Sequence, residues 1–293
     1  MFYRGFLLLC CVSTILAQPA ARKLRVISFG AHPDDCDYRV GGTAAKFARL
    51  GHQVKFVALT NGDAGHQSEG GGALARRRRA EAQEAGRRLG IASYEVLDNH
   101  DGELLPTLPV RHQVIRKIRE WNADIVLAPR PWDYHPDHRY TGAVVQDAAY
   151  MVVVPNVCPD TPALRKNPVF LYHEDEFQRP NPFRPDVAID IDDTFEAKVS
   201  AFDAHVSQMY EWGPFLDGAL ASVPKDPVAR REWLRKGWFS GPPAPAILKA
   251  LEKWYGPSAQ RIRHAEAFEV CEYGHRPTEQ ELRELFPFLP QTR

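Results

Sequence analysis

Short apolar runs that alternate with amphipathic helical segments constrain the fold of this chain most strongly. Runs rich in β-branched and aromatic residues, which predict buried strands, occupy residues 25–30, 54–60, 94–97 and 124–128. The segments between them place apolar side chains at the period of a helix, over residues 41–50, 76–89 and 110–121. Strands and helices that alternate at this spacing build right-handed βαβ units. The sequence therefore predicts a Rossmann-like α/β fold, a mostly parallel sheet with helices on both faces.

The second half of the chain changes character after about residue 155. Two further strands are expected at residues 169–172 and 187–191, and a helix at 194–210. Residues 211–293 are rich in Trp, Pro and Arg and carry no motif with a chemical role. We interpret residues 21–210 as one α/β domain and residues 211–293 as a C-terminal helical appendage packed on it.

The N-terminal residues have the pattern of a secretory signal. One Arg precedes the apolar run 6–17, and small residues and a Pro follow it, with a plausible cleavage point near Ala17 or Ala20. The run is shorter than the roughly 20 residues that span a bilayer. We therefore expect a signal peptide at residues 1–20, export to the periplasm or the cell exterior, and no stable membrane span after its removal.

Charge and cysteine content exclude some classes of protein. Lys plus Arg equals Asp plus Glu, 37 each, so the chain has no basic field that would favour nucleic acid as a partner. Two of the five Cys fall in the signal, and Cys36, Cys158 and Cys271 remain without a Cys-x-x-Cys pattern. The sequence predicts no disulfide framework, and one pair at most.

Two clusters of His and Asp follow two of the predicted strands. Ala31-His32-Pro33-Asp34-Asp35 follows the first strand, and the loop 129–138, which contains His135 and His138, follows the fourth. Open α/β sheets bind ligands at the carboxyl ends of their strands. A single cluster of this kind is often only a hydrogen-bonded turn, but two that converge at one sheet edge predict a site.

The residue types in these clusters favour a metal. Imidazole and carboxylate ligands with no nearby Cys suit Zn²⁺, or another divalent first-row metal, with one position open to water. Water bound there ionises near neutral pH and becomes a nucleophile. A carboxylate off the metal can act as its general base, and a His off the metal can polarise a carbonyl or protonate a leaving amine. The residues alone thus predict metal-assisted hydrolysis.

Several motifs together resemble a known family. They are Ala31-His32-Pro33-Asp34-Asp35 with Gly41-Gly42-Thr43, Leu59-Thr60-Asn61-Gly62-Asp63, Arg78 with Glu81-Ala82, and His135-Pro136-Asp137-His138. This pattern is similar to the PIG-L/LmbE-like N-acetylglucosaminyl deacetylases, and the bacterial branch of bacillithiol and mycothiol synthesis looks closest. The resemblance covers roughly residues 24–210, which it identifies as a deacetylase domain.

The resemblance implies roles for individual residues. It makes His32, Asp35 and His138 the zinc ligands and Asp34 the general base. His135 would stabilise the oxyanion or protonate the amine.

Three further residues fall where members of the family contact substrate: Arg78, Asp101 and His205. Arg78 is equally well read as a solvated member of the charge run 76–79, and His205 as a satisfied histidine on a helix face.

The sequence leaves three hypotheses for function. The first is a zinc-dependent deacetylase that hydrolyses the N-acetyl amide of a small N-acetylglucosamine-like amino sugar. The second keeps the same machinery but acts on an amide that is not a sugar. The third is a non-catalytic Rossmann-like binding protein, which is disfavoured because His-Pro-Asp-Asp occupies the turn where Gly-x-Gly-x-x-Gly would bind a nucleotide. The resemblance also allows a homo-oligomer, although no sequence pattern marks an interface.

Overall fold

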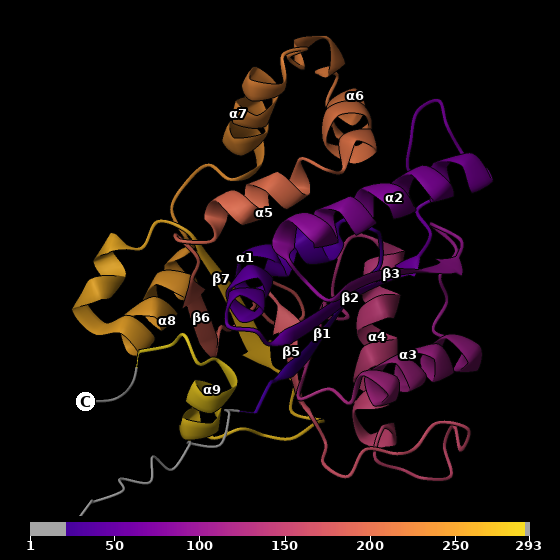
Figure 1. Cartoon of the computed structure of the whole chain (residues 1–293), viewed down its shortest axis with the longest axis vertical. Helices are drawn as coiled ribbons and strands as arrows, with labels where there is room; N and C mark the ends of the chain where they lie inside the picture. Colours follow the sequence, from indigo (N-terminus) through magenta and orange to yellow (C-terminus); the bar gives the residue numbers. More distant parts are fainter. Residues whose placement is uncertain (1–21, 291–293) are drawn as a thin grey trace, which may run out of the picture.

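A single mixed sheet organises the chain, whose computed structural model describes residues 22–290 (Figure 1). The expected signal peptide lies outside these residues. Within them, seven strands pair in the order β3-β2-β1-β4-β5-β7-β6. Their bounds are β1 (Arg25–Gly30), β2 (Gln53–Thr60), β3 (Ser93–Asn99), β4 (Ile125–Ala128), β5 (Val169–His173), β6 (Val187–Asp190) and β7 (Ala265–Val270).

The strand directions confirm the predicted α/β fold. Strands β1 to β5 pair in parallel, and β7 runs antiparallel to its neighbours β5 and β6. The order reverses at β1, which pairs with β2 on one side and β4 on the other. This is the topological switch point at which open α/β sheets bind ligands.

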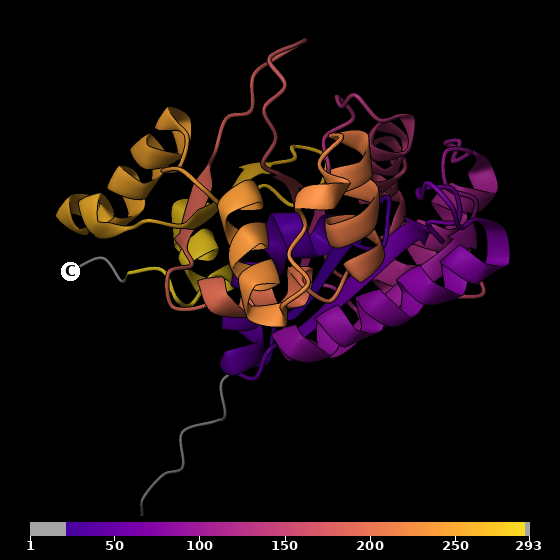
Figure 2. The ribbon, with the colours of Figure 1, turned by 90° about the horizontal axis from the view of Figure 1, so that it is seen from above.

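Helices cover both faces of the sheet, as Figures 1 and 2 show. One face is covered by α1 (Asp35–Arg49), α2 (Gly71–Leu89) and α5 (Phe195–Phe202), and the other by α3 (Leu108–Trp121) and α4 (Pro136–Met151). Alternate residues of β1 enter the two apolar layers, Val26 on the first side and Ile27 and Phe29 on the second. The central strands are therefore buried on both faces, which explains their uninterrupted apolar runs.

Boundaries of three helices differ from the sequence prediction, and α2 begins at Gly71 and not at residue 76. Helix α1 begins at Asp35 and not at residue 41, so Gly42 lies inside the helix, where an added Cβ would come within 2.7 Å of Ile191. The glycine allows close packing and does not mark a helix start. The helix expected over residues 194–210 ends at Phe202, and a separate π-helix follows at Ser207–Trp212.

The C-terminal extension is not wholly helical. It contains α6 (Gly213–Leu216), α7 (Pro227–Trp238), α8 (Pro245–Tyr255), α9 (Glu279–Leu285) and the strand β7, which lies between β5 and β6. Periodicity did not reveal β7 because two of its six residues are Glu and two are Ala, types that strands disfavour. Glu266 of β7 is buried, where it accepts hydrogen bonds from the backbone N–H groups of Gly42 and Thr43 and pairs with Lys198.

The described part of the chain contains neither a membrane-spanning helix nor a disulfide. No helix in residues 22–290 combines the length and apolar character that crossing a bilayer requires. In the same range Cys36, Cys158 and Cys271 are buried free thiols, so no disulfide links them.

Arg119 organises the loop that follows α4. Its side chain is buried on α3, and its guanidinium donates hydrogen bonds to the carbonyl oxygens of residues 151, 152, 154, 157, 158 and 161. A loop without regular structure must satisfy its backbone groups in some other way. Arg119 supplies the partners that this segment lacks.

We expect Arg119→Met to lower the free energy of unfolding by about 3 kcal/mol, because it leaves buried carbonyl groups without donors. Denaturant titration measures this loss. The control is Arg116→Met on the same helix, whose half-exposed side chain pairs with exposed Asp160 and should contribute less than about 1 kcal/mol. Equal stability of the two variants would show that water satisfies the loop.

Candidate active site

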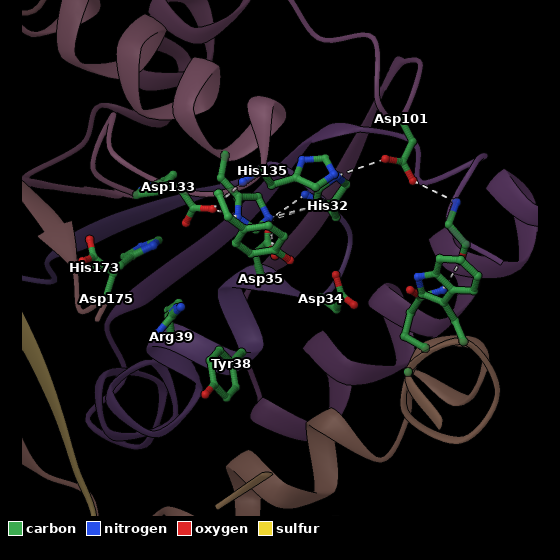
Figure 3. Close-up of a pocket in the computed structure, with 18 of the residues that line it drawn as sticks. His32, Asp34, Asp35, Tyr38, Arg39, Asp101, Asp133, His135, His173 and Asp175 are labelled. Carbon is green, nitrogen blue, oxygen red and sulfur yellow. Dashed lines mark hydrogen bonds and ion pairs between the residues drawn. The ribbon is translucent and has the colours of Figure 1, made fainter. Parts of the chain in front are cut away.

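The two predicted clusters meet because β1 and β4 are neighbours. Their parallel register pairs Val26 with Ile125 and Ser28 with Leu127, so both strands end at the same edge of the sheet. The loop that contains His32 leaves β1, and the loop that contains His138 leaves β4. They enclose one side of a cavity of about 850 Å³ (Figure 3).

The first loop is shaped by the carboxylate of Asp35. Its Oδ2 accepts hydrogen bonds from the backbone N–H groups of Ala31 and His32, each at 2.8 Å. Gly30 permits this tight turn, since an added Cβ would lie 2.7 Å from the Cβ of Asp35. The backbone thus fixes one oxygen of Asp35, while Oδ1 lies 3.4 Å from Nε2 of His138.

The second loop is shaped by Asp133. Its Oδ1 accepts the backbone N–H of His135 at 2.9 Å and lies 3.0 Å from Nδ1 of His138. His135 caps α4, because its Nδ1 accepts the backbone N–H of Asp137 at 3.2 Å. Both imidazoles are therefore oriented through one ring nitrogen.

Three side chains bring donor atoms close together, and the two oxygens of Asp35 face different rings, Oδ2 toward His32 and Oδ1 toward His138. Nδ1 of His32 lies 3.1 Å from Nε2 of His138 and 3.6 Å from Oδ2 of Asp35. Two ligands of a tetrahedral zinc ion, each about 2.0–2.1 Å from the metal, lie about 3.3 Å apart. The spacing and types of these donors fit a zinc-like ion.

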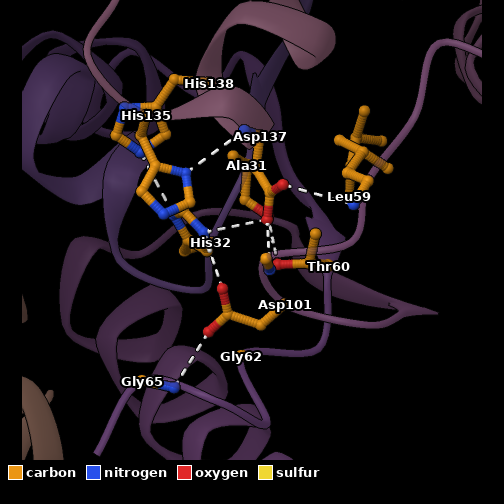
Figure 4. A network of polar contacts seen from close by, with 12 residues as sticks. Ala31, His32, Leu59, Thr60, Gly62, Gly65, Asp101, His135, Asp137 and His138 are labelled. Atoms are coloured by element: carbon orange, nitrogen blue, oxygen red, sulfur yellow. Dashed lines mark hydrogen bonds and ion pairs between the residues drawn. The ribbon is translucent and has the colours of Figure 1, made fainter.

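Carboxylates contact the remaining nitrogens of both imidazoles, and Figure 4 shows those beside His32. Nε2 of His32 is buried and lies 3.1 Å from Asp101 and 3.4 Å from Asp137, although neither contact has the alignment of a good hydrogen bond. Nδ1 of His138 faces Asp133. Histidines that hold metals almost always donate their second N–H to such a partner.

Other groupings of donors are less suited to an ion. His32, His135 and His138 form one set and His32, Asp101 and Asp137 another, each with three potential ligand atoms within 4.8 Å. The first uses His135, whose Nδ1 already caps α4, and the second uses the ring nitrogen of His32 that faces away from His138. We therefore prefer the set with Asp35.

The electrostatics of the cluster favour positive charge. Burial alone would lower the pKa of His32, but contacts with Asp101, Asp137 and Asp35 raise it well above its usual range. His138 follows the same pattern, since burial lowers its pKa and Asp35 and Asp133 raise it to about 9. The carboxylates thus compensate a cation at this point, whether protons or a metal ion supply it.

Asp34 stands beside the donor set and outside it. It lines the cavity, and its Oδ1 accepts a hydrogen bond from Arg78 at 3.1 Å. The Arg78 side chain is only 4% exposed and also lies 3.4 Å from Asp101. Arg78 is therefore buried in the cavity wall and is not a solvated member of the charge run, and Asp101 lines the same wall.

His135 lines the cavity with one nitrogen available. Burial lowers its pKa, and the nearby His32 and His138 lower it further, so the ring is neutral at neutral pH. Because Nδ1 accepts the N–H of Asp137, the proton lies on Nε2. His135 can therefore donate a hydrogen bond to an oxygen in the cavity.

His205 does not reach the cavity lining. Its ring is 1% exposed, and its Nε2 lies 3.0 Å from Asp37 inside the protein. The next turn, a π-helix, lines the cavity with Gln208, Met209 and Trp212. Sequence reasoning found the histidine of this segment and missed its neighbours, because periodicity alone did not show where the helix changes.

Residues beyond position 211 also line the cavity. Trp212, Gly213, Leu216 and Trp238 form part of its wall. The sequence analysis assigned no role to Asp133, although its spacing from His135 and His138 was a usable signal. The Trp residues of the extension offered no such signal.

Comparison with known proteins relates the chain to deacetylases. The PIG-L family, described as GlcNAc-PI de-N-acetylase, matches residues 27–149, which include both clusters, Arg78 and Asp101. A diacetylchitobiose deacetylase from Thermococcus kodakarensis is 33% identical over 208 residues, 66% of this chain and 74% of the relative. A probable N-acetyl-alpha-D-glucosaminyl L-malate deacetylase 2 from Bacillus cereus is 28% identical over 218 residues, 71% and 93% of the two chains.

Comparison with solved structures also relates the chain to a deacetylase. The N,N'-diacetylchitobiose deacetylase from Pyrococcus horikoshii, complexed with its inhibitor MPG, superposes with a TM-score of 0.64 at 26% identity. The match covers 85% of this chain and 84% of that one.

We expect Asp133→Asn to weaken zinc binding about 10- to 100-fold, because a neutral amide orients His138 less firmly and makes it a weaker ligand. Competition with a chromophoric chelator measures the affinity. The control is Asp147→Asn, an exposed position on α4 that pairs with Arg111 and should leave zinc affinity unchanged. If Asp133→Asn binds zinc as tightly as the wild-type protein, Asp133 does not contribute to the metal site.

Proposed function

Because the chain belongs to the PIG-L family of LmbE-like deacetylases, hydrolases of amide C–N bonds, we propose that it removes the acetyl group from an N-acetylglucosamine-like substrate. His32, Asp35 and His138 would hold the zinc ion, or another divalent first-row metal. The observation that carries the proposal is that donor atoms of these three side chains lie 3.1–3.6 Å from one another, with His32 facing Oδ2 of Asp35 and His138 facing Oδ1, beside the carboxylate of Asp34 in a large cavity.

The metal, when bound, supplies a Lewis acid that activates water and the amide carbonyl. Asp34 takes the proton from the attacking water, since its carboxylate lines the cavity beside the ligand set without belonging to it. Arg78 fixes the direction of that carboxylate through Oδ1. The remaining oxygen of Asp34 is then available for the proton.

His135 stabilises the charge that develops on the amide oxygen. Its Nε2–H can donate into the cavity, and its ring is held by the N-terminus of α4. A neutral imidazole donates a hydrogen bond readily but gives up its proton poorly. We therefore favour the role of oxyanion stabiliser for His135 in the attack step. The proton collected by Asp34 can then return to the leaving amine.

The substrate class rests on the relatives. Both curated relatives carry names of enzymes that deacetylate an N-acetylglucosamine unit. Arg78 and Asp101 line the cavity next to the ligand set, so we propose that they contact the sugar. His205 pairs with Asp37 inside the protein and does not line the cavity, so we do not propose that it contacts substrate.

The proposed setting is that of an exported enzyme. The apolar run at residues 6–17 carries this part of the proposal by itself. We also propose that residues 21–210 are the deacetylase domain and that residues 211–293 complete its cavity wall, as the lining residues Trp212 and Trp238 suggest.

We expect Asp34→Asn to reduce kcat about 10²- to 10⁴-fold, the usual contribution of a general base, while zinc stays bound. Acetate release and zinc content per chain measure the two effects. Asp35→Asn is the matched variant one residue away, and it should lose both zinc and activity. Loss of zinc in Asp34→Asn would contradict its assignment as the base.

Purified wild-type protein loaded with zinc should release acetate from N-acetylglucosamine or a conjugate of it. A panel of N-acetyl sugars and non-sugar N-acetyl amides separates the proposed function from its alternative. Release from non-sugar amides alone would favour a different amidohydrolase. No release from any compound would overturn the deacetylase assignment.

A further inference from the structure

Arg39 is a cation in the cavity that the proposed chemistry does not use. It follows Asp35 by four residues on α1, so both residues share the face of the helix that lines the cavity. One helical turn of about 6 Å separates them along the axis. In the view of Figure 3, Arg39 and Tyr38 lie across the ligand set from Asp101.

The guanidinium of Arg39 has a packed face and free edges. Its Cζ lies 4.7 Å from the ring centre of Tyr38, and Trp238 meets the same ring edge-on at 5.8 Å. Within residues 22–290, it makes no hydrogen bond and no ion pair. Stacking on Tyr38 orients the plane of the guanidinium and leaves its N–H donors unused.

Other arginines of the cavity differ in this respect. Arg78 pairs with Asp34 and Asp101, and Arg130 pairs with Asp175. Their charges are already compensated by the protein. A half-buried guanidinium without a carboxylate is therefore an exception within this cavity, and half-buried charges usually have partners.

A second, smaller cavity adjoins the first at Arg39. It measures about 200 Å³ and shares Tyr38, Arg39, Glu174 and Trp238 with the larger one. Lys198 in its wall pairs with Glu266, and His264 pairs with Asp192. Arg263 also lines it and is exposed.

Glu174 is the carboxyl group that could compensate Arg39. It lines both cavities but makes no ion pair within 4.0 Å among the described residues. Burial raises the pKa of Glu174, and Arg39 only partly opposes that rise. With Arg39 and Arg263 against one carboxyl group, the unpaired charges at this junction are positive in sum.

From this geometry we propose that the junction of the two cavities, with Arg39 at its centre, binds an anionic substituent of the substrate. The inference rests on the proposed deacetylase function and refines its substrate class: an N-acetylated amino sugar that carries a carboxylate or phosphate group. The fork of N–H donors on Arg39 suits the paired oxygens of either group. The acetamide would lie at His32, Asp35 and His138, and the anion one helical turn further along α1.

Two matched substrate pairs test the proposal. N-acetylglucosaminyl malate is compared with its dimethyl ester, and N-acetylglucosamine 1-phosphate with methyl N-acetylglucosaminide. Each pair differs in charge and keeps the amide, so the first pair reports on a carboxylate and the second on a phosphate. We expect kcat/KM to favour the anion about 10- to 100-fold in at least one pair, mainly through KM.

Arg39→Met should reduce that ratio to about one, and Arg39→Lys should retain part of it, because lysine keeps the charge without the fork. The control is Arg49→Met near the end of the same helix, where Arg49 pairs with Asp193 away from both cavities. It should keep the wild-type ratio. A wild-type ratio near one, or an undiminished ratio in Arg39→Met, would overturn the anion site.

Calorimetric titration of the same four compounds separates this proposal from the proposed function. If no compound releases acetate, the deacetylase assignment fails and binding decides the anion site. If the wild-type protein binds the anionic member of a pair more tightly and Arg39→Met loses this preference, the anion site is supported even though the deacetylase assignment has failed. Equal or absent binding of both members of each pair would overturn it.

Discussion

The parallel pairing of β1 with β4 is the constraint on which the site depends. These strands come from positions about a hundred residues apart, and their register places His32 and His138 at the same sheet edge. The strand order reverses there, so no helix crosses directly over the gap between the two strand ends. The contacts between the loop after β1 and the loop after β4 follow from this juxtaposition.

The chemistry at that edge is dominated by carboxylates around imidazoles. Asp35 turns one oxygen to the backbone and the other to His138, while Asp101, Asp137 and Asp133 face the outer nitrogens of the two rings. So many buried carboxylates require compensating positive charge. This arrangement supports our proposal that a divalent ion binds here and that Asp34, held by Arg78, accepts the proton of the attacking water.

The far side of the cavity is formed by segments outside the family match. The PIG-L match ends at residue 149, whereas Trp212, Leu216 and Trp238 line the cavity from the extension. The extension also inserts β7 into the sheet and sets the ring of Trp238 edge-on against Tyr38, beside Arg39. The extension therefore contributes part of the cavity wall from outside the shared motifs, which fits our proposal that it completes the site.

Much of the fold was predictable, because each buried parallel strand appears in the sequence as a continuous apolar run. Such a run can be recognised without knowing which distant residues it contacts. The strand β7 was not, since Glu266 is stabilised there by Gly42, Thr43 and Lys198, which are far away in the sequence. The start of α1 was missed for a related reason: Gly42 reflects packing against Ile191 and not a local signal.

The sequence by itself determined the chemical types of the site, because His32, Asp34, Asp35, His135 and His138 stand in short motifs whose residues suit one kind of chemistry. Only the tertiary structure decided which nitrogen of each ring faces which carboxylate, that Arg78 is buried against Asp34, and that His205 turns away to Asp37. It also left Arg39, within residues 22–290, without a hydrogen bond or an ion pair. These outcomes depend on contacts between distant segments, and no local pattern encodes which side chains will meet.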